Sequence, residues 1–417
     1  MQQPTRFQWL SLGQLLLSGL GFLLFALGGV ALLLMGVAGL TGSSLVDRTQ
    51  VLPYFSLMWV CGLVCLLVAP SIVLSSMRLL LRSRRSSIGK PLPAWQWRGS
   101  FRAASWAMLA WPLAIAAGTW ISRTGTLDWL FLPPLQILAV ALPLWWLIEF
   151  GRRGLPGSGP QRSWGILSAG LLVSPTVALV VELLAIVVLL LVFVVWLSSQ
   201  PGALEQVTLL AQRLSNAGSD PEVLMRIVRP MVETPAVLIS IILATSGVFP
   251  LIEELVKPLG LWVLAGRKPT PAQGFIFGLL SGAAFALLES LGTIANPSGQ
   301  DWLGVVLGRT GTGMLHTVCS GLMGWALASA WQDGRYLRLA GTYLLAVGLH
   351  GLWNLFGIVL ALPTVFGTAS VTGIAALLLR LGQVAPIVLV VLMILLFSIL
   401  LVSNRRLRLE SGKIDPS

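Results

Sequence analysis

Long apolar runs recur along the whole chain, and no other feature limits its possible folds as strongly. A helix needs about 20 apolar residues to cross roughly 30 Å of hydrocarbon. Runs of that length follow one another from the first residues to the last, separated by short polar stretches. Only 10% of the 417 residues are charged, whereas a soluble domain carries about 25%. The sequence therefore predicts an all-α polytopic membrane protein and excludes an ordinary water-soluble enzyme.

The apolar runs divide into ten expected membrane-spanning helices. An even number places both termini on one side of the membrane. Most of the 27 basic residues lie in segments on that side, and the positive-inside rule makes it the cytoplasmic side. We therefore expect a multi-pass protein of the plasma membrane with both termini in the cytoplasm, and no nucleic-acid partner despite the net charge of +12. The expected spans are 12–40, 53–75, 103–122, 129–149, 170–198, 236–265, 273–295, 302–331, 338–362 and 383–402.

The polar residues of the spans are concentrated after position 250, which predicts four parts. Residues 1–163 form an accessory N-terminal region of four spans, and 164–235 hold the fifth span and an outer loop. Residues 236–365 form the catalytic core from the sixth to ninth spans, and 366–417 hold the last span and a basic tail. In the outer loop, residues 201–233 predict two short amphipathic helices on the outer leaflet, either a plain connector or a flap over a lateral entrance.

Ionisable side chains inside a membrane are unusual because each costs about 2.5–3.5 kcal/mol at mid-bilayer. Both histidines of the chain lie in expected spans, together with several acids. At about 1.5 Å per residue from the cytoplasmic helix ends, these groups reach similar depths. We therefore expect them to meet in one cavity. The expected site residues are Glu253, Glu254, Lys257, Glu289, His316, His350 and Asn354.

Small residues repeat every four positions beside these polar groups, which lets helices approach closely. The stripes are Gly274, Gly278 and Gly282, leading to Phe285 and Glu289, and Gly308, Thr312, His316, Ser320 and Gly324. We expect both stripes to face other helices, with Phe285 and Ser320 supporting the site. Arg309 can snorkel outward or pair with Glu289. Single residues also have purely structural interpretations: a Glu253–Lys257 ion pair, a core histidine at 350 and an interhelical hydrogen bond from Asn354.

Four short motifs follow one another on consecutive expected spans. They are Glu253-Glu254-x-x-Lys257, Phe285-x-x-x-Glu289, His316, and His350-x-x-x-Asn354. In order and spacing they resemble the PrsW-type intramembrane proteases, which are related to the CAAX-prenyl endopeptidases and bacteriocin-immunity membrane proteins. The resemblance covers roughly residues 245–360, and it departs where Thr293 replaces the family's tyrosine. It implies hydrolysis of a membrane-protein or lipid-anchored peptide substrate within the bilayer.

Two mechanisms suit these residues. In a glutamic mechanism without cofactor, Glu253 and Glu289 activate water, while Glu254 and Lys257 tune the site. His316 then orients water or substrate, and resemblance to the prenyl endopeptidases implies that His350 and Asn354 hold the oxyanion. In a metalloprotease mechanism, Zn²⁺ is bound by His316, His350 and either Glu289 or Glu254. The standard HExxH helix is absent from the sequence.

Two non-proteolytic functions also fit buried acids and histidines. A proton-coupled transporter uses such residues as a relay. Many transporters pair two broken helices, whereas the sequence predicts one, near Pro250, and no mirrored partner. A non-catalytic scaffold is the other alternative, and it would tolerate glutamine at both Glu253 and Glu254.

Overall fold

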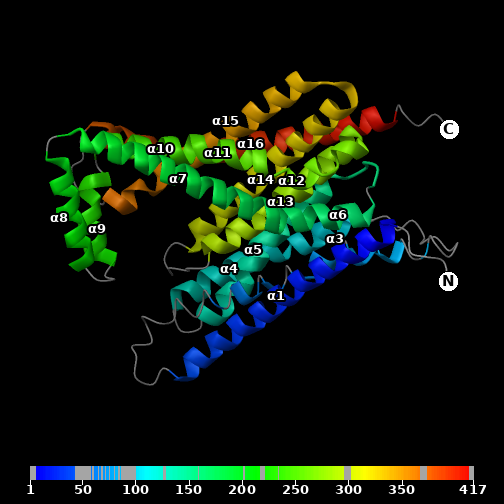
Figure 1. Ribbon diagram of the computed structural model, residues 1–417, viewed down its shortest axis with the longest axis horizontal. Helices are drawn as coiled ribbons and strands as arrows, with labels where there is room; N and C mark the ends of the chain where they lie inside the picture. Colours follow the sequence, from blue (N-terminus) through cyan, green and yellow to red (C-terminus); the bar gives the residue numbers. More distant parts are fainter. Residues whose placement is uncertain are drawn as a thin grey trace. The chain divides into compact units, whose positions relative to one another are not determined.

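The computed structural model consists of helices joined by short segments (Figure 1). It describes residues 6–42, scattered positions in 58–85, and residues 100–124, 128–157, 159–200, 202–216, 221–232, 234–294, 302–366 and 373–412. Within these ranges there is no strand. Among the described residues, eight helices are long and apolar enough to cross a membrane. The predicted all-α polytopic membrane protein is therefore confirmed.

The number of spans stays a prediction. The expected span 53–75 lies largely outside the described residues. The expected span 302–331 is a helix, α14 (Trp302–Asp333), but it is not among the eight apolar ones. Arg380, which the sequence left between a loop and the last span, lies within helix α16 (Gly373–Gly412).

Two compact units make up the chain, and each is described by itself. The first is Met1–Pro175, Val256–Ala346 and Leu396–Ser417, and the second is Thr176–Leu255 and Val347–Leu395. Helices α7 (Ser174–Ser198), α15 (Tyr336–Phe366) and α16 contribute to both. The first unit also holds α1 (Arg6–Gly42), α3 (Phe101–Met108), α4 (Ala110–Thr124), α5 (Asp128–Gly151), α6 (Pro160–Ser168), η1 (Ala169–Val173), α12 (Leu259–Trp262), η3 (Ala265–Arg267), α13 (Pro271–Ile294) and α14. The second holds α8 (Ala203–Asn216), α9 (Pro221–Val232), α10 (Pro235–Leu243), η2 (Ala244–Val248) and nearly all of α11 (Phe249–Val256). The four-part division expected from the sequence stays a prediction.

Helices α13 and α14 pack closely in the first unit because their facing residues are small. A methyl group on Gly274 would collide with the carbonyl oxygen of Gly324, and one on Gly278 would collide with that of Ser320. A methyl group on Gly282 would meet the His316 carbonyl. The predicted packing stripe of α13 is therefore confirmed. The prediction for Gly308 is wrong, because this residue is exposed and its Cβ position faces open space.

The core of the second unit lies between α10, α15 and α16, where Leu238 packs with Val359 and Ala385. Helices α8 and α9 lie side by side as a hairpin in this unit (Figure 1). Two short helices in residues 201–233 are thus confirmed, and the second begins at Pro221. Their position on the outer leaflet stays a prediction.

In the part of the chain that the structure describes, two helices are interrupted by π-helical turns, and each turn ends two residues before a proline. Turn η1 precedes Ser174-Pro175, and turn η2 precedes Phe249-Pro250. A proline inside a helix lacks an N–H donor and clashes with the carbonyl four residues earlier, and a wider turn relieves that clash. The expectation of one broken helix, near Pro250, was therefore incomplete.

Candidate active site

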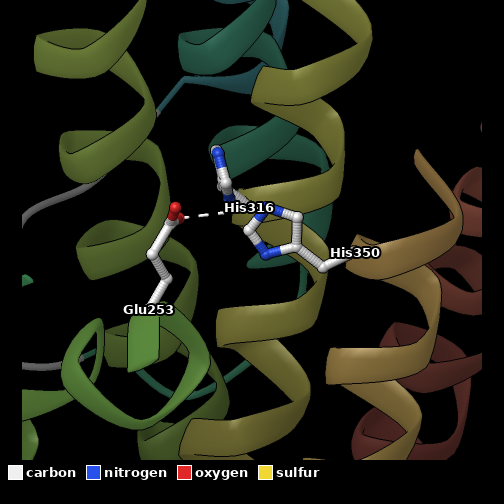
Figure 2. Close-up of side chains that lie close together, drawn as sticks. All are labelled: Glu253, His316 and His350. Atoms are coloured by element: carbon white, nitrogen blue, oxygen red, sulfur yellow. Dashed lines mark ion pairs between the residues drawn. The ribbon is translucent and has the colours of Figure 1, made fainter. Parts of the chain in front are cut away.

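Glu253, Glu254 and His350 form one cluster, inside the second unit. The Nδ1 atom of His350 lies 2.9 Å from Oε1 of Glu254, at hydrogen-bond distance. Its Nε2 atom lies 3.9 Å from Oε2 of Glu253, and a dashed line marks this pair in Figure 2. Glu254 and His350 are buried, and the side chain of Glu253 is 13% exposed. The two neighbouring glutamates therefore face different nitrogens of the same imidazole.

Asn354 connects the histidine helix to the π-helical turn of the same unit. Its Nδ2 amide donates a 2.8 Å hydrogen bond to the backbone carbonyl of Thr245, within η2. One turn earlier on α15, a methyl group on Gly351 would collide with the carbonyl oxygen of Ser246. Carbonyls of a π turn lie outside the regular ladder and can accept from side chains. The carbonyl groups of the π turn before Pro250 therefore form the surface against which α15 packs.

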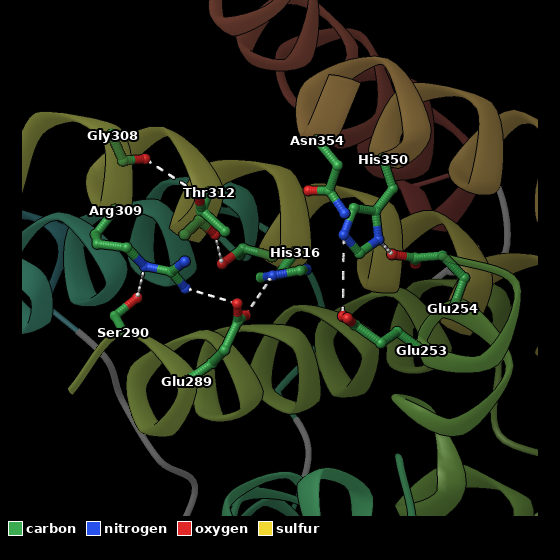
Figure 3. Close-up of polar contacts among 12 residues, drawn as sticks. Glu253, Glu254, Glu289, Ser290, Gly308, Arg309, Thr312, His316, His350 and Asn354 are labelled. Carbon is green, nitrogen blue, oxygen red and sulfur yellow. Dashed lines mark hydrogen bonds and ion pairs between the residues drawn. The ribbon is translucent and has the colours of Figure 1, made fainter. Parts of the chain in front are cut away.

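Glu289 and His316 form a second cluster, inside the first unit. The Oε2 atom of Glu289 lies 2.7 Å from Nε2 of His316. Its Oε1 atom forms a 2.9 Å ion pair with Nη2 of Arg309, and the Nε of that arginine donates to Ser290 Oγ at 3.2 Å. Figure 3 shows the Glu289 carboxylate between its two partners. Of the two interpretations of Arg309, pairing with Glu289 is the one found here.

Phe285 and Lys257 extend this second cluster. The Phe285 ring meets the His316 ring edge-on, with centroids 5.5 Å apart. Lys257, which is fully buried, places its Nζ atom 5.1 Å from the Phe285 ring centroid. A cation over an aromatic face is stabilised by the ring quadrupole. Phe285 therefore contacts two other predicted site residues of its unit, His316 and Lys257.

Two buried serines missed by the sequence prediction bind the backbone of Lys257 within the first unit. The carbonyl oxygen of Lys257, which follows α11, accepts hydrogen bonds from Ser174 Oγ at 3.1 Å and from Ser281 Oγ at 2.5 Å. The last carbonyls of a helix have no partner within the helix, and the following proline cannot provide one. The only available signal was a polar residue on each of two apolar helices, and serine is common there in packing roles.

The remaining predicted residues have simpler surroundings. Ser320 is buried on α14 against Gly282, as a packing role predicts. Thr293 belongs to α13, but its side chain lies outside the described residues. Each predicted acid and histidine of the site thus has a partner from the predicted set within its own unit.

Comparison with known proteins identifies the family. The model of the PrsW family intramembrane metalloproteases matches residues 163–396, which is more than half of the chain. No curated protein and no solved structure matches the sequence. The matched range contains both clusters and the motifs that carry the resemblance. The chain therefore belongs to the PrsW family of intramembrane metalloproteases, and it is a membrane-embedded peptidase.

Proposed function

We propose that the protein is a zinc-dependent intramembrane protease in which Glu253, His316 and His350 bind the metal. The three side chains are labelled in Figure 2. One carboxylate and two imidazoles are donors that Zn²⁺ prefers, and three protein ligands leave a position open for chemistry. This proposal retains the expectation that helices α11, α13, α14 and α15 bring their polar groups to one layer of the membrane.

The observation that carries the proposal is that each histidine has a carboxylate on one ring nitrogen. Glu254 engages Nδ1 of His350, and Glu289 engages Nε2 of His316. Metal-binding histidines almost always have such a partner, because it fixes the tautomer and the direction of the ring. The nitrogen opposite each carboxylate then becomes the ligand atom: Nε2 of His350 and Nδ1 of His316.

Glu253 is the better carboxylate ligand for the same reason. The oxygens of Glu289 are occupied by His316 and Arg309, and Glu254 contacts the histidine nitrogen that faces away from Glu253. Oε2 of Glu253 and Nε2 of His350 are 3.9 Å apart. This distance is too long for a hydrogen bond, and it suits two ligand atoms that bind the same metal ion. We therefore propose Glu253 in place of Glu289 or Glu254 as the acidic ligand.

The other residues then act by holding the ligands. A bound zinc ion would supply the Lewis acid that polarises the scissile carbonyl. Glu254 and Glu289 orient the two imidazoles, while Asn354 seats α15 on the carbonyl of Thr245. We propose that the substrate is a membrane-protein or lipid-anchored peptide that enters sideways from the bilayer.

Zinc content and cleavage test this function together. Wild-type protein purified in detergent should contain one zinc per chain, lose peptidase activity on chelation and regain it with added zinc. Glu253→Gln, His316→Gln and His350→Gln should each lower both zinc content and cleavage. Gln136→Leu is a matched control, because Gln136 is a fully buried polar residue of α5 outside both clusters.

A glutamic mechanism makes the opposite prediction. Active wild-type protein that contains no stoichiometric metal and resists chelation would overturn the zinc proposal and favour water activation by Glu253. The substrate can be sought by comparing membrane proteomes of cells with wild type and with the Glu253→Gln, Glu254→Gln double variant. A fragment found only with wild type identifies a substrate under either mechanism.

A further inference from the structure

Arg309 is a cation of the expected span 302–331 that neither the family resemblance nor metal binding explains. It lies on α14, seven residues before His316, so two helical turns separate them on one helix face. Its side chain is only 14% exposed, so it does not extend into water. A charged residue in a membrane span is costly and is retained where it pairs or serves a function.

The guanidinium contacts two consecutive residues of α13. Its Nη2 pairs with Oε1 of Glu289 at 2.9 Å, and its Nε donates to Ser290 Oγ at 3.2 Å. Ser290 is fully buried, which restricts the position of the guanidinium. With Oε1 held, the carboxylate of Glu289 has its other oxygen at 2.7 Å from Nε2 of His316. Three side chains thus form a continuous chain, Arg309–Glu289–His316 (Figure 3).

Helix packing does not require this ion pair. Helices α13 and α14 are held by the glycine stripe, where Gly274, Gly278 and Gly282 meet the backbone of α14 from Gly324 to His316. Arg309 lies beyond the end of that stripe, where a methyl group on neighbouring Gly308 would meet open space. The ion pair therefore lies outside the glycine contacts that hold the two helices together, and it fixes the direction of a carboxylate.

We infer that Arg309 is a positioning residue that holds Glu289 so that His316 keeps one tautomer and one ring direction. An acceptor oxygen on Nε2 favours the tautomer that carries its hydrogen there, which leaves Nδ1 to face a ligand. The inference concerns the geometry of His316, and its importance for metal binding rests on the proposed function. A purely structural ion pair would stabilise the fold without affecting the imidazole.

Nitrogen resonances of the imidazoles test the inference directly, because the chain has only two histidines. Full-length protein labelled with ¹⁵N-histidine gives two sets of ring signals, and His350→Gln assigns them. Wild type should show His316 as a single Nε2–H tautomer. Arg309→Gln should shift the His316 signals towards a tautomer mixture and leave those of His350 unchanged. Arg309→Lys, which keeps a cation for Glu289, should recover part of the wild-type pattern.

Arg152→Gln is the matched control. Arg152 forms an ion pair with Glu149 in the same unit and is 12% exposed, close to the value for Arg309. It should lower the unfolding temperature without moving either set of histidine signals. Unchanged His316 signals in Arg309→Gln would overturn the inference, and so would an equal shift in Arg152→Gln.

Zinc titration separates this inference from the proposed function. If both hold, Arg309→Gln weakens zinc binding about 10- to 100-fold, the usual effect of removing a group that supports a metal ligand. If wild type binds no zinc while Arg309→Gln still shifts the His316 signals, the zinc proposal fails and the positioning role stands. Unchanged zinc affinity and unchanged His316 signals reject the positioning role alone.

Discussion

Glu253 and Glu254 are adjacent in sequence, yet they contact opposite sides of one imidazole. Glu254 is fully buried and lies at hydrogen-bond distance from Nδ1 of His350, whereas Glu253 faces Nε2 at 3.9 Å. The adjacent pair of acids therefore divides into a proposed ligand and a proposed supporting group. The position of His350 between the two carboxylates determines this division. The motif Glu-Glu-x-x-Lys does not predict that position.

Replacing Glu254 should weaken the site without destroying it. We expect Glu254→Gln to lower zinc affinity about 10- to 100-fold, because the amide oxygen still accepts from Nδ1 but carries no charge. Glu253→Gln should abolish stoichiometric zinc binding, because a ligand is lost. Chelator competition and peptide-cleavage rates measure both effects. A dead Glu254→Gln beside a fully active Glu253→Gln would show that the two roles are exchanged.

Asn354 should stabilise the packing of α15 against the π turn η2. Removing its hydrogen bond to the Thr245 carbonyl leaves a backbone group unsatisfied, so we expect Asn354→Ala to lower the free energy of unfolding by about 1–3 kcal/mol. Thermal unfolding in detergent measures this loss. Thr245→Val is the control, since it keeps the main-chain acceptor, and the effect of Asn354→Ala should be the same in that background. Loss of the effect there would assign the bond to the threonine side chain.

At the scale of elements, the pairing of α13 with α14 depends on the absence of side chains. Gly278→Ala would place a methyl group against the Ser320 carbonyl and 2.8 Å from Gly321 Cα. We expect a loss of about 1–3 kcal/mol in stability, as for other overpacked positions. Gly308→Ala on α14 should be neutral or stabilise by up to about 1 kcal/mol, because its Cβ faces open space. Equal unfolding temperatures for the two variants would contradict this account.

The sequence predicts some helix contacts and helix shapes but not others. The glycine stripe of α13 was predictable because four-residue spacing and small side chains determine a close helix contact directly. Gly308 has the same spacing on α14 and still faces open space, since spacing alone does not say where the partner helix ends. The π turns at Ala169–Val173 and Ala244–Val248 were not predicted, because a proline allows either a kink or a wider turn. The serines that bind the Lys257 carbonyl depend on three helices meeting, which no local pattern encodes.

At the scale of the whole molecule, the sequence predicted the fold class and the family from apolar length and motif order. Hydropathy sufficed because a membrane admits few structures other than helices. Motif order sufficed because the acids and histidines are rare enough in such helices to be informative. Orientation and the number of spans depend on loops and on residues 53–75, and both stay predictions.

Thiol labelling can test the orientation. In a background without the native cysteines, Ser215→Cys on α8 should react with a membrane-impermeant reagent in intact cells, because the hairpin is expected on the outer face. Ser411→Cys at the end of α16 should react only after the membrane is permeabilised, because both termini are expected in the cytoplasm. The reverse pattern would invert the topology, and labelling of both from outside would require an even number of spans between the two sites, where the sequence predicts five.

The π turn before Pro250 is also a point where the chain can change length. A wide turn fits one additional residue into Ala244–Val248, so later side chains leave the axis at nearly the angle of an uninterrupted helix. Deleting one residue of this turn should therefore restore a regular helical turn and leave Glu253 and Glu254 facing the same way. Deleting Leu251 in the regular helix α11 should instead turn Glu254 into the direction that Glu253 has now, because each residue advances a regular helix by about 100°. Deletion scanning would reveal this difference between neighbouring segments, and substitution scanning would miss it.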